Sequence, residues 1–274
     1  MKITDPFFAL SEIIAIQTIG TAQSGANRPL FIEGIEKENG KRGGYVLKYR
    51  GAERMTPSTS AKELLAAFMA IELGIQTPQP ALVYVTDNFL ETLTHHVDYQ
   101  NILKGKGVNF GSVNVHPNNN IIYQQQLTPE QQQQALQIFV FDLWIQNADR
   151  RFEKPNMFFS QDKIFVIDHE LAFSFLDVFA FVPQSPPFLL DDMEINSAKN
   201  HFFYTILHHN KHLDLDAAFQ PFNTLNTYFW QRVQQFTPPN WFQALDIKRI
   251  ENHCNLILEN CETFKQEIWT KLMA

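Results

Sequence analysis

Side chains that can do chemistry gather between positions 144 and 170, which read WIQNADRRFEKPNMFFSQDKIFVIDHE. Asp149 follows a helical pattern, Asn156 leads one short apolar run, and Asp168 ends the next. A carboxylate can orient a hydroxyl or accept its proton, and an amide with a second carboxylate can hold a hard divalent cation through oxygen. This set of residue types is what the transfer of a phosphoryl group to a hydroxyl requires.

A predicted hairpin would bring these residues together. The two apolar runs are separated by Gln161, Asp162 and Lys163, which indicate a turn between antiparallel strands. The start of the first strand then lies beside the end of the second, so Asn156 and Asp168 would both face the loop that holds Asp149. Taken one at a time, each of these residues could also be an ordinary turn or strand-end residue.

Helices are expected on both sides of this hairpin. Thr128, Pro129 and Gln131 form the pattern of an N-cap, a first-turn proline and a capping-box partner, and the helix they start should end near Asn147. After Asp168 the chain reads as mostly helical, with breaks at 183–187 and 237–240 and a last helix over 246–271.

The N-terminal part reads as a β-hairpin, a helix and a further strand. The runs at 31–32 and 45–47 are strand-like, and the run at 81–85 returns as a strand after the helix. Lys48 ends the second strand, and we expect Glu63 in the first turn of a helix capped by Ser60. The alternatives are a solvated lysine at a strand edge and a simple capping box formed by Ser60 and Glu63.

Two segments together resemble a known family. Asn-x-Asp-Arg, then Pro-Asn opening a hairpin, then Ile-Asp-His, resembles the catalytic segment of the HipA-like kinases, a bacterial branch of the protein-kinase-like superfamily related to phosphoinositide kinases. GGYVLKYR followed by SAKELLAAFMAIELGIQTPQPALVYV resembles the N-terminal lobe of the same family. The resemblance covers about 15–90 and 125–175.

The resemblance implies an α+β, two-lobed, protein-kinase-like fold. Its N-terminal lobe would be a β-sheet with one main helix, and its C-terminal lobe would be mostly helical. We therefore expect a nucleotide-binding lobe at 1–90, a connector with loops at 91–126, and a catalytic lobe at 127–274.

The resemblance also assigns roles to the residues of the C-terminal segment. Asp149 would be the catalytic base, and Arg150 a charge near the phosphates or near the catalytic carboxylate. Asn156 and Asp168 would bind Mg²⁺. Lys154 stands five positions after Asp149, where an asparagine is expected, so the choice of Asn156 as a ligand depends on the hairpin.

In the N-terminal lobe the resemblance implies that Lys48 holds the α- and β-phosphates of ATP and that Glu63 positions it. The phosphate loop would be GTAQSGANRP at 20–29, which offers Ser24 and Gly25 as nucleotide-binding residues but has few glycines. The segment after Asp168 also departs from related motifs, because a glycine is missing there.

The implied function is an ATP- and Mg²⁺-dependent kinase that transfers the γ-phosphate to a hydroxyl, with protein serine or threonine as the implied acceptor and a regulatory protein as a possible partner. Two alternatives stay open. One is a nucleotide-binding pseudokinase that acts as an interaction module, and the other is a phosphotransferase for a small molecule or lipid.

Composition narrows the remaining classes. The 274 residues carry 22 Lys and Arg against 29 Asp and Glu, a net charge of -7 that argues against a nucleic-acid partner. No apolar run reaches the roughly 18 residues of a membrane span, and the N-terminus does not resemble a signal peptide. Cys254 and Cys261, seven positions apart in the expected last helix, read as free thiols, so we expect a cytoplasmic protein.

Overall fold

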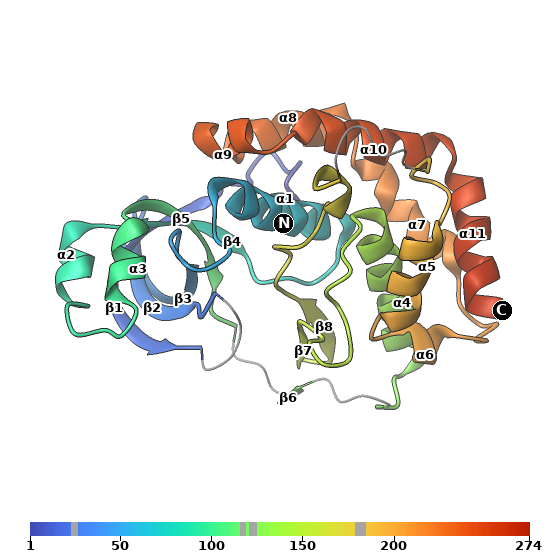
Figure 1. Ribbon diagram of the computed structural model, residues 1–274, viewed down its shortest axis with the longest axis horizontal. Coiled ribbons are helices and arrows are strands. Elements are labelled where there is room, and N and C mark those ends of the chain that lie inside the picture. The colour runs from blue at the N-terminus through green and yellow to red at the C-terminus, as the bar shows by residue number, and fades with distance from the viewer. Residues whose placement is uncertain (23–26, 116–118, 121–124, 179–184) are drawn as a thin grey trace.

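A computed structural model describes residues 1–22, 27–115, 119–120, 125–178 and 185–274. Figure 1 shows strands β1 to β5 at one end of the molecule, helices α4 to α7 and α11 at the other, and α1 between them, with α8 and α9 above α1 in this view. The prediction of an N-terminal sheet with one main helix and a mostly helical C-terminal part is therefore confirmed.

The N-terminal sheet closes into a five-stranded barrel in the order β1-β2-β3-β5-β4, a closure that the sequence did not predict. Strands β1 and β4 pair in parallel, and the other neighbours are antiparallel. Its interior is filled by apolar side chains such as Ile13, Leu30 and Leu47. The strands are β1 (Ser11–Thr21), β2 (Leu30–Glu36), β3 (Arg42–Lys48), β4 (Pro80–Val85) and β5 (Gly107–Val113).

Strand β5 comes from the segment that we expected to be a connector, and that expectation was wrong for these residues. The strand pairs with β3 on one side and β4 on the other, and Phe110 lies opposite both Lys48 and Leu82. Its sequence GVNFGSV does not indicate a strand, because Asn109 interrupts the apolar pattern. Asn109 is fully buried, and its amide donates to the carbonyls of Gly105 and Gly107.

Helix α1 (Pro57–Leu73) begins earlier than predicted. Thr56 is the N-cap and forms a capping box with Thr59, whereas Ser60 is buried inside the helix. Glu63 consequently lies in the second turn, and the capping-box alternative for Glu63 is excluded. The helix ends at Gly74, as predicted, in a left-handed conformation with φ 80.

The predicted helix before the segment that carries Asp149 is α4 (Pro129–Trp144), with a capping box between Thr128 and Gln131 as expected. It leads to the predicted hairpin of β7 (Met157–Ser160) and β8 (Lys163–Val166), to which β6 (Asn119–Asn120) adds a third strand. A single apolar cluster joins α1, α4, this hairpin and the C-terminal helices.

The remaining helices are short, apart from α8, α10 and α11 near the C-terminus. The α-helices are α2 (Asp87–Glu91), α3 (Tyr99–Lys104), α5 (Asp192–Asn200), α6 (Tyr204–Leu207), α7 (Leu215–Phe219), α8 (Thr227–Phe236), α9 (Pro239–Ala244), α10 (Ile247–Glu259) and α11 (Cys261–Met273), and the 3-10 helices are η1 (Ser174–Leu176) and η2 (Gln220–Thr224). Within the described ranges, no helix combines the length and the apolar character that crossing a membrane demands.

The prediction of a single last helix over 246–271 is wrong, because the structure has two helices there, α10 and α11, which are separated at Asn260. The Asn260 backbone leaves the helical region with φ -118 and ψ 31, and its side chain donates to the carbonyl of Leu256 at 2.9 Å. Cys254 and Cys261 therefore lie in different helices, and both are free thiols.

Candidate active site

Lys48 lies at the end of β3, where its ammonium joins two carboxylates. Nζ contacts Oε1 of Glu63 on α1 and lies 2.8 Å from Oδ1 of Asp168. Burial alone would lower the pKa of Lys48, but the two carboxylates outweigh burial and raise it. The Lys48 side chain is only 12% exposed, so the reading as a solvated strand-edge lysine is excluded.

Glu63 links α1 to the segment after β8 as well. Its Oε2 accepts the backbone N–H of His169 at 3.1 Å, while Oε1 holds Lys48. With a side chain only 2% exposed, Glu63 is committed to these partners. The contact aligns the barrel strand that carries Lys48 with the end of the hairpin that carries Asp168.

Asn156 and Asp168 lie at adjacent ends of the hairpin, as predicted. Met157 pairs with Val166, and the Ile167 N–H donates to the carbonyl of Asn156 at 2.9 Å. Asn156 and Asp168 both adopt left-handed backbone conformations, with φ 49 and φ 63. Such conformations are uncommon for residues other than glycine, and strained residues of this kind cluster at functional sites.

Asp149 lies against both of these residues. Its Oδ2 accepts from Nδ2 of Asn156 at 3.1 Å and lies 2.8 Å from Nζ of Lys154. The same Nζ is 2.8 Å from Oδ2 of Asp168, so the two carboxylate oxygens are separated by at most twice that distance. The structure therefore brings Asp149, Asn156 and Asp168 together, as the hairpin predicted.

Lys154 is the residue of this site to which we had assigned no role. Its side chain is 35% exposed and bridges Asp149 and Asp168. Burial would lower the pKa of Lys154, but the two carboxylates outweigh burial and raise it. Its position five residues after Asp149 was a signal, which we took only as a departure from the expected asparagine.

Arg150, which we expected to be a charge near the phosphates or near the catalytic carboxylate, has its guanidinium in the interior of the protein, against α4. The side chain is fully buried, and its guanidinium holds both carboxylate oxygens of Asp142 on α4. Its NH1 donates to the Asn156 carbonyl at 2.7 Å. Burial works to raise the pKa of Asp142, but Arg150 and His201 hold it well below its usual range. Arg150 therefore ties the hairpin to α4.

Ser24 and Gly25, the predicted phosphate-loop residues, lie outside the residues that the structure describes. The loop re-enters the described part at Asn27, which is buried. Asn27 connects it to the site, because its Nδ2 donates to a carboxylate oxygen of Glu170 and its Oδ1 accepts the Arg54 N–H at 2.9 Å. Burial, with the nearby Asp168 carboxylate, raises the pKa of Glu170 to about 7.

The donor atoms at the hairpin fit a hard divalent cation. Glu63, Asp168 and Glu170 offer carboxylate oxygens that lie within 4.8 Å of one another. Asn156, whose amide nitrogen contacts Asp149, carries a further oxygen at the start of the same hairpin. All three carboxylates hold internal partners: Lys48 contacts Glu63 and Asp168, Lys154 contacts Asp168, and Asn27 contacts Glu170. Because these donors are all oxygens, the site suits Mg²⁺, with Asp168 and Asn156 as the candidate ligands.

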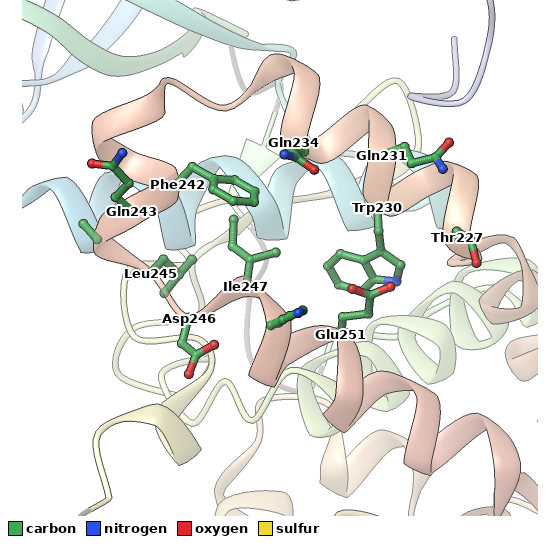
Figure 2. Close-up of a pocket in the computed structure, with 12 residues that line it drawn as sticks. Thr227, Trp230, Gln231, Gln234, Phe242, Gln243, Leu245, Asp246, Ile247 and Glu251 are labelled. Atoms are coloured by element: carbon green, nitrogen blue, oxygen red, sulfur yellow. The ribbon is translucent and has the colours of Figure 1, made fainter.

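A separate groove lies at the C-terminal end of the chain. It has a volume of about 830 Å³ and is formed by side chains of α8, α9 and α10, among them Trp230, Phe242 and Glu251 (Figure 2). None of the predicted site residues lines it. The candidate active site is therefore defined by the charged array at the hairpin, and this groove is no part of it.

A barrel lysine paired with a helix glutamate, and facing acidic residues on a loop and a hairpin, is the arrangement of a kinase-like protein. The model of the family described as HipA-like kinase matches residues 16–180, which is more than half of the chain. The protein belongs to this family, which confirms the resemblance. The comparison with curated proteins found no match.

Proposed function

We propose that the protein is an ATP- and Mg²⁺-dependent kinase that transfers the γ-phosphoryl group to a hydroxyl, with serine or threonine of a protein as the acceptor. The main support is one continuous array of charges. Lys48 joins Glu63 to Asp168, and Lys154 joins Asp168 to Asp149. A phosphate-binding cation, a metal-binding carboxylate and a base would then lie in line.

In this proposal the chain forms two lobes, and ATP binds between the barrel and the hairpin. Lys48 holds the α- and β-phosphates, and Glu63 keeps Lys48 in place through their buried contact. Asn156 and Asp168 hold Mg²⁺, which when bound neutralises charge on the phosphate oxygens. Arg150 fixes the hairpin from the α4 side.

Asp149 acts on the acceptor. Its carboxylate orients the hydroxyl for in-line attack on the γ-phosphorus and takes the hydroxyl proton as the new O–P bond forms and ADP leaves. The Asp149 side chain is 6% exposed and pairs with Lys154 and Arg151, so an acceptor reaches it only when one of these contacts opens. Asn156 holds this carboxylate through its side-chain amide.

We predict that Asp149→Asn lowers phosphoryl transfer by about a thousandfold or more, because the amide cannot accept the proton. Binding of a non-hydrolysable ATP analogue with Mg²⁺ should change little. Transfer is measured with labelled ATP and binding by calorimetry. Asp162→Asn, at the exposed turn of the same hairpin, is the matched control and should behave as the wild type.

Transfer by Asp149→Asn at the wild-type rate would show that Asp149 is not the base. If the wild-type protein bound ATP with Mg²⁺ but phosphorylated no acceptor, the pseudokinase alternative would be favoured. Phosphoamino-acid analysis of the labelled product separates a protein serine or threonine acceptor from a small molecule or lipid.

A further inference from the structure

Both carboxylate oxygens of Asp168 are engaged by ammonium groups. Oδ1 lies 2.8 Å from Nζ of Lys48, and Oδ2 lies 2.8 Å from Nζ of Lys154. A divalent cation that binds Asp168 would lie beside both ammonium groups, and the repulsion between these positive charges favours the displacement of one of them. Which lysine gives way depends on how firmly each one is held.

Lys48 is the more firmly held of the two. It is 12% exposed, lies on a barrel strand, and is paired with Glu63. Lys154 is 35% exposed and extends from the loop between Asp149 and the hairpin. The exposed ammonium can re-enter solvent or turn toward a ligand at a lower desolvation cost than the buried one. Lys154 is consequently the lysine that can leave.

We propose that Lys154 is an internal counter-ion, which neutralises Asp149 and Asp168 before the nucleotide binds and gives up Asp168 to an incoming divalent cation. Its released ammonium then faces the transferred phosphoryl group. This inference rests on the proposed function and adds a residue to it. Lys154 has two separable effects, since it competes with the metal at Asp168 and adds positive charge at the phosphate.

The two effects have opposite signs when Lys154 is removed. Without this ammonium, the cations that remain in contact with the two carboxylates among the described residues are Arg151, 3.5 Å from Asp149, and Lys48, beside Asp168. The two carboxylates then repel each other more strongly, and a divalent cation relieves that repulsion. Metal affinity in the absence of nucleotide should therefore rise, while transfer should fall because a charge at the phosphate is lost. A purely structural lysine would not tighten metal binding when it is removed.

The first test uses Mn²⁺ as the probe, with the nucleotide-free full chain and electron paramagnetic resonance as the readout. Lys154→Met should bind Mn²⁺ about tenfold more tightly than the wild type, a difference of about 1.4 kcal/mol in binding free energy. Its transfer rate should fall about a hundredfold. Lys154→Arg, which keeps the charge, should retain near wild-type Mn²⁺ affinity. Lys163→Met, at an exposed position of the same hairpin, should change neither quantity.

A second measurement needs no variant. Amine-reactive labelling of the wild-type protein, read residue by residue by mass spectrometry, should show Lys154 labelled several times faster when Mn²⁺ is present, with Lys163 unaffected. Unchanged labelling of Lys154, or equal Mn²⁺ affinity of Lys154→Met and the wild type, overturns the counter-ion role. If these metal effects appear in a protein that transfers no phosphate, the counter-ion role stands and the proposed kinase activity fails.

Discussion

At the scale of residues, the site depends on two ammonium groups that each join a pair of carboxylates. Lys48 joins Glu63 and Asp168, and Lys154 joins Asp168 and Asp149. The Lys48 side chain is more buried than that of Lys154, so we expect the two lysines to have different roles. The buried lysine, Lys48, should contribute to folding as well as to the proposed nucleotide binding, whereas the more exposed Lys154 is available to respond to a ligand.

We predict that Lys48→Met lowers the free energy of unfolding by about 3 kcal/mol, because Glu63 is left buried with an uncompensated charge. Adding Glu63→Gln to this variant should recover much of the loss, which a double-mutant cycle in chemical denaturation measures. Lys37→Met, which breaks the exposed pair with Glu12, should cost less than about 1 kcal/mol. Equal losses for Lys48→Met and Lys37→Met would contradict the coupling.

The Arg150 contacts had a signal in the sequence that we did not use. Asp142 stands within the apolar run FVFDLW of a helix, and a carboxylate in such a run needs a buried partner. The spacing around Asp149 does not say which way Arg150 points. Only the fold shows that the guanidinium meets Asp142 and the hairpin carbonyl.

At the scale of elements, the barrel positions Lys48 through strand β5, which packs closely against its neighbours. A Cβ on Gly111 would lie 2.4 Å from Cγ2 of Val83 and 2.8 Å from the carbonyl of Val46. Backbone and a β-branched side chain cannot both move away in a closed barrel. Gly111 therefore allows the closure between β3 and β4 that holds Lys48 opposite Phe110.

We predict that Gly111→Ala lowers the free energy of unfolding by about 1–3 kcal/mol, the usual cost of overpacking. Gly44→Ala is the matched control in the neighbouring strand β3, where the added Cβ meets nothing closer than 3.6 Å. It should be neutral or slightly stabilising, since alanine loses less entropy than glycine on folding. Equal stability of the two variants in urea denaturation would show that β5 is not closely packed there.

Helices, strands and turns were predicted correctly where the sequence pattern that indicates them lies within a few neighbouring residues. The capping box at Thr128 and the helix end at Gly74 are local, and both were predicted correctly. The turn was predicted at 161–163, and the structure limits it to 161–162 because Lys163 is the first residue of β8. Strand β5 was missed because Asn109 and Gly111 are unusual residues for a strand. They fit there because of contacts with segments that are distant in sequence, such as Val83 and Val46 beside Gly111. The break at Asn260 was missed because the apolar pattern continues through it, whereas the Asn260 backbone leaves the helix.

At the scale of the whole molecule, the N-terminal segment connects α1 to the C-terminal helices. Thr4 donates to Glu72 on α1 through its N–H at 3.1 Å and its hydroxyl at 2.8 Å. Arg232 on α8 donates to the carbonyls of Ile3 and Phe8 at 3.2 and 3.1 Å. The helix that carries Glu63 is thus fixed to the helical part of the chain as well as to the barrel.

The candidate site was more predictable than the fold that carries it, because Asp149, Asn156 and Asp168 lie within one short segment around a predicted hairpin. Asp149, Asn156 and Asp168 meet as predicted, with Lys48 and Glu63 beside them. Lys154 could not be placed from sequence, because a flexible side chain on a loop has no periodic pattern to follow. Its role became visible only with the distances to two carboxylates.

The most direct test of the central claim is a crystal structure with a non-hydrolysable ATP analogue and Mn²⁺, in which anomalous scattering locates the metal. We predict a manganese peak bound by Asp168 and Asn156, the triphosphate against Lys48, and the Asp149 carboxylate facing the γ-phosphate. A nucleotide bound elsewhere, or a metal held by neither Asp168 nor Asn156, would contradict it.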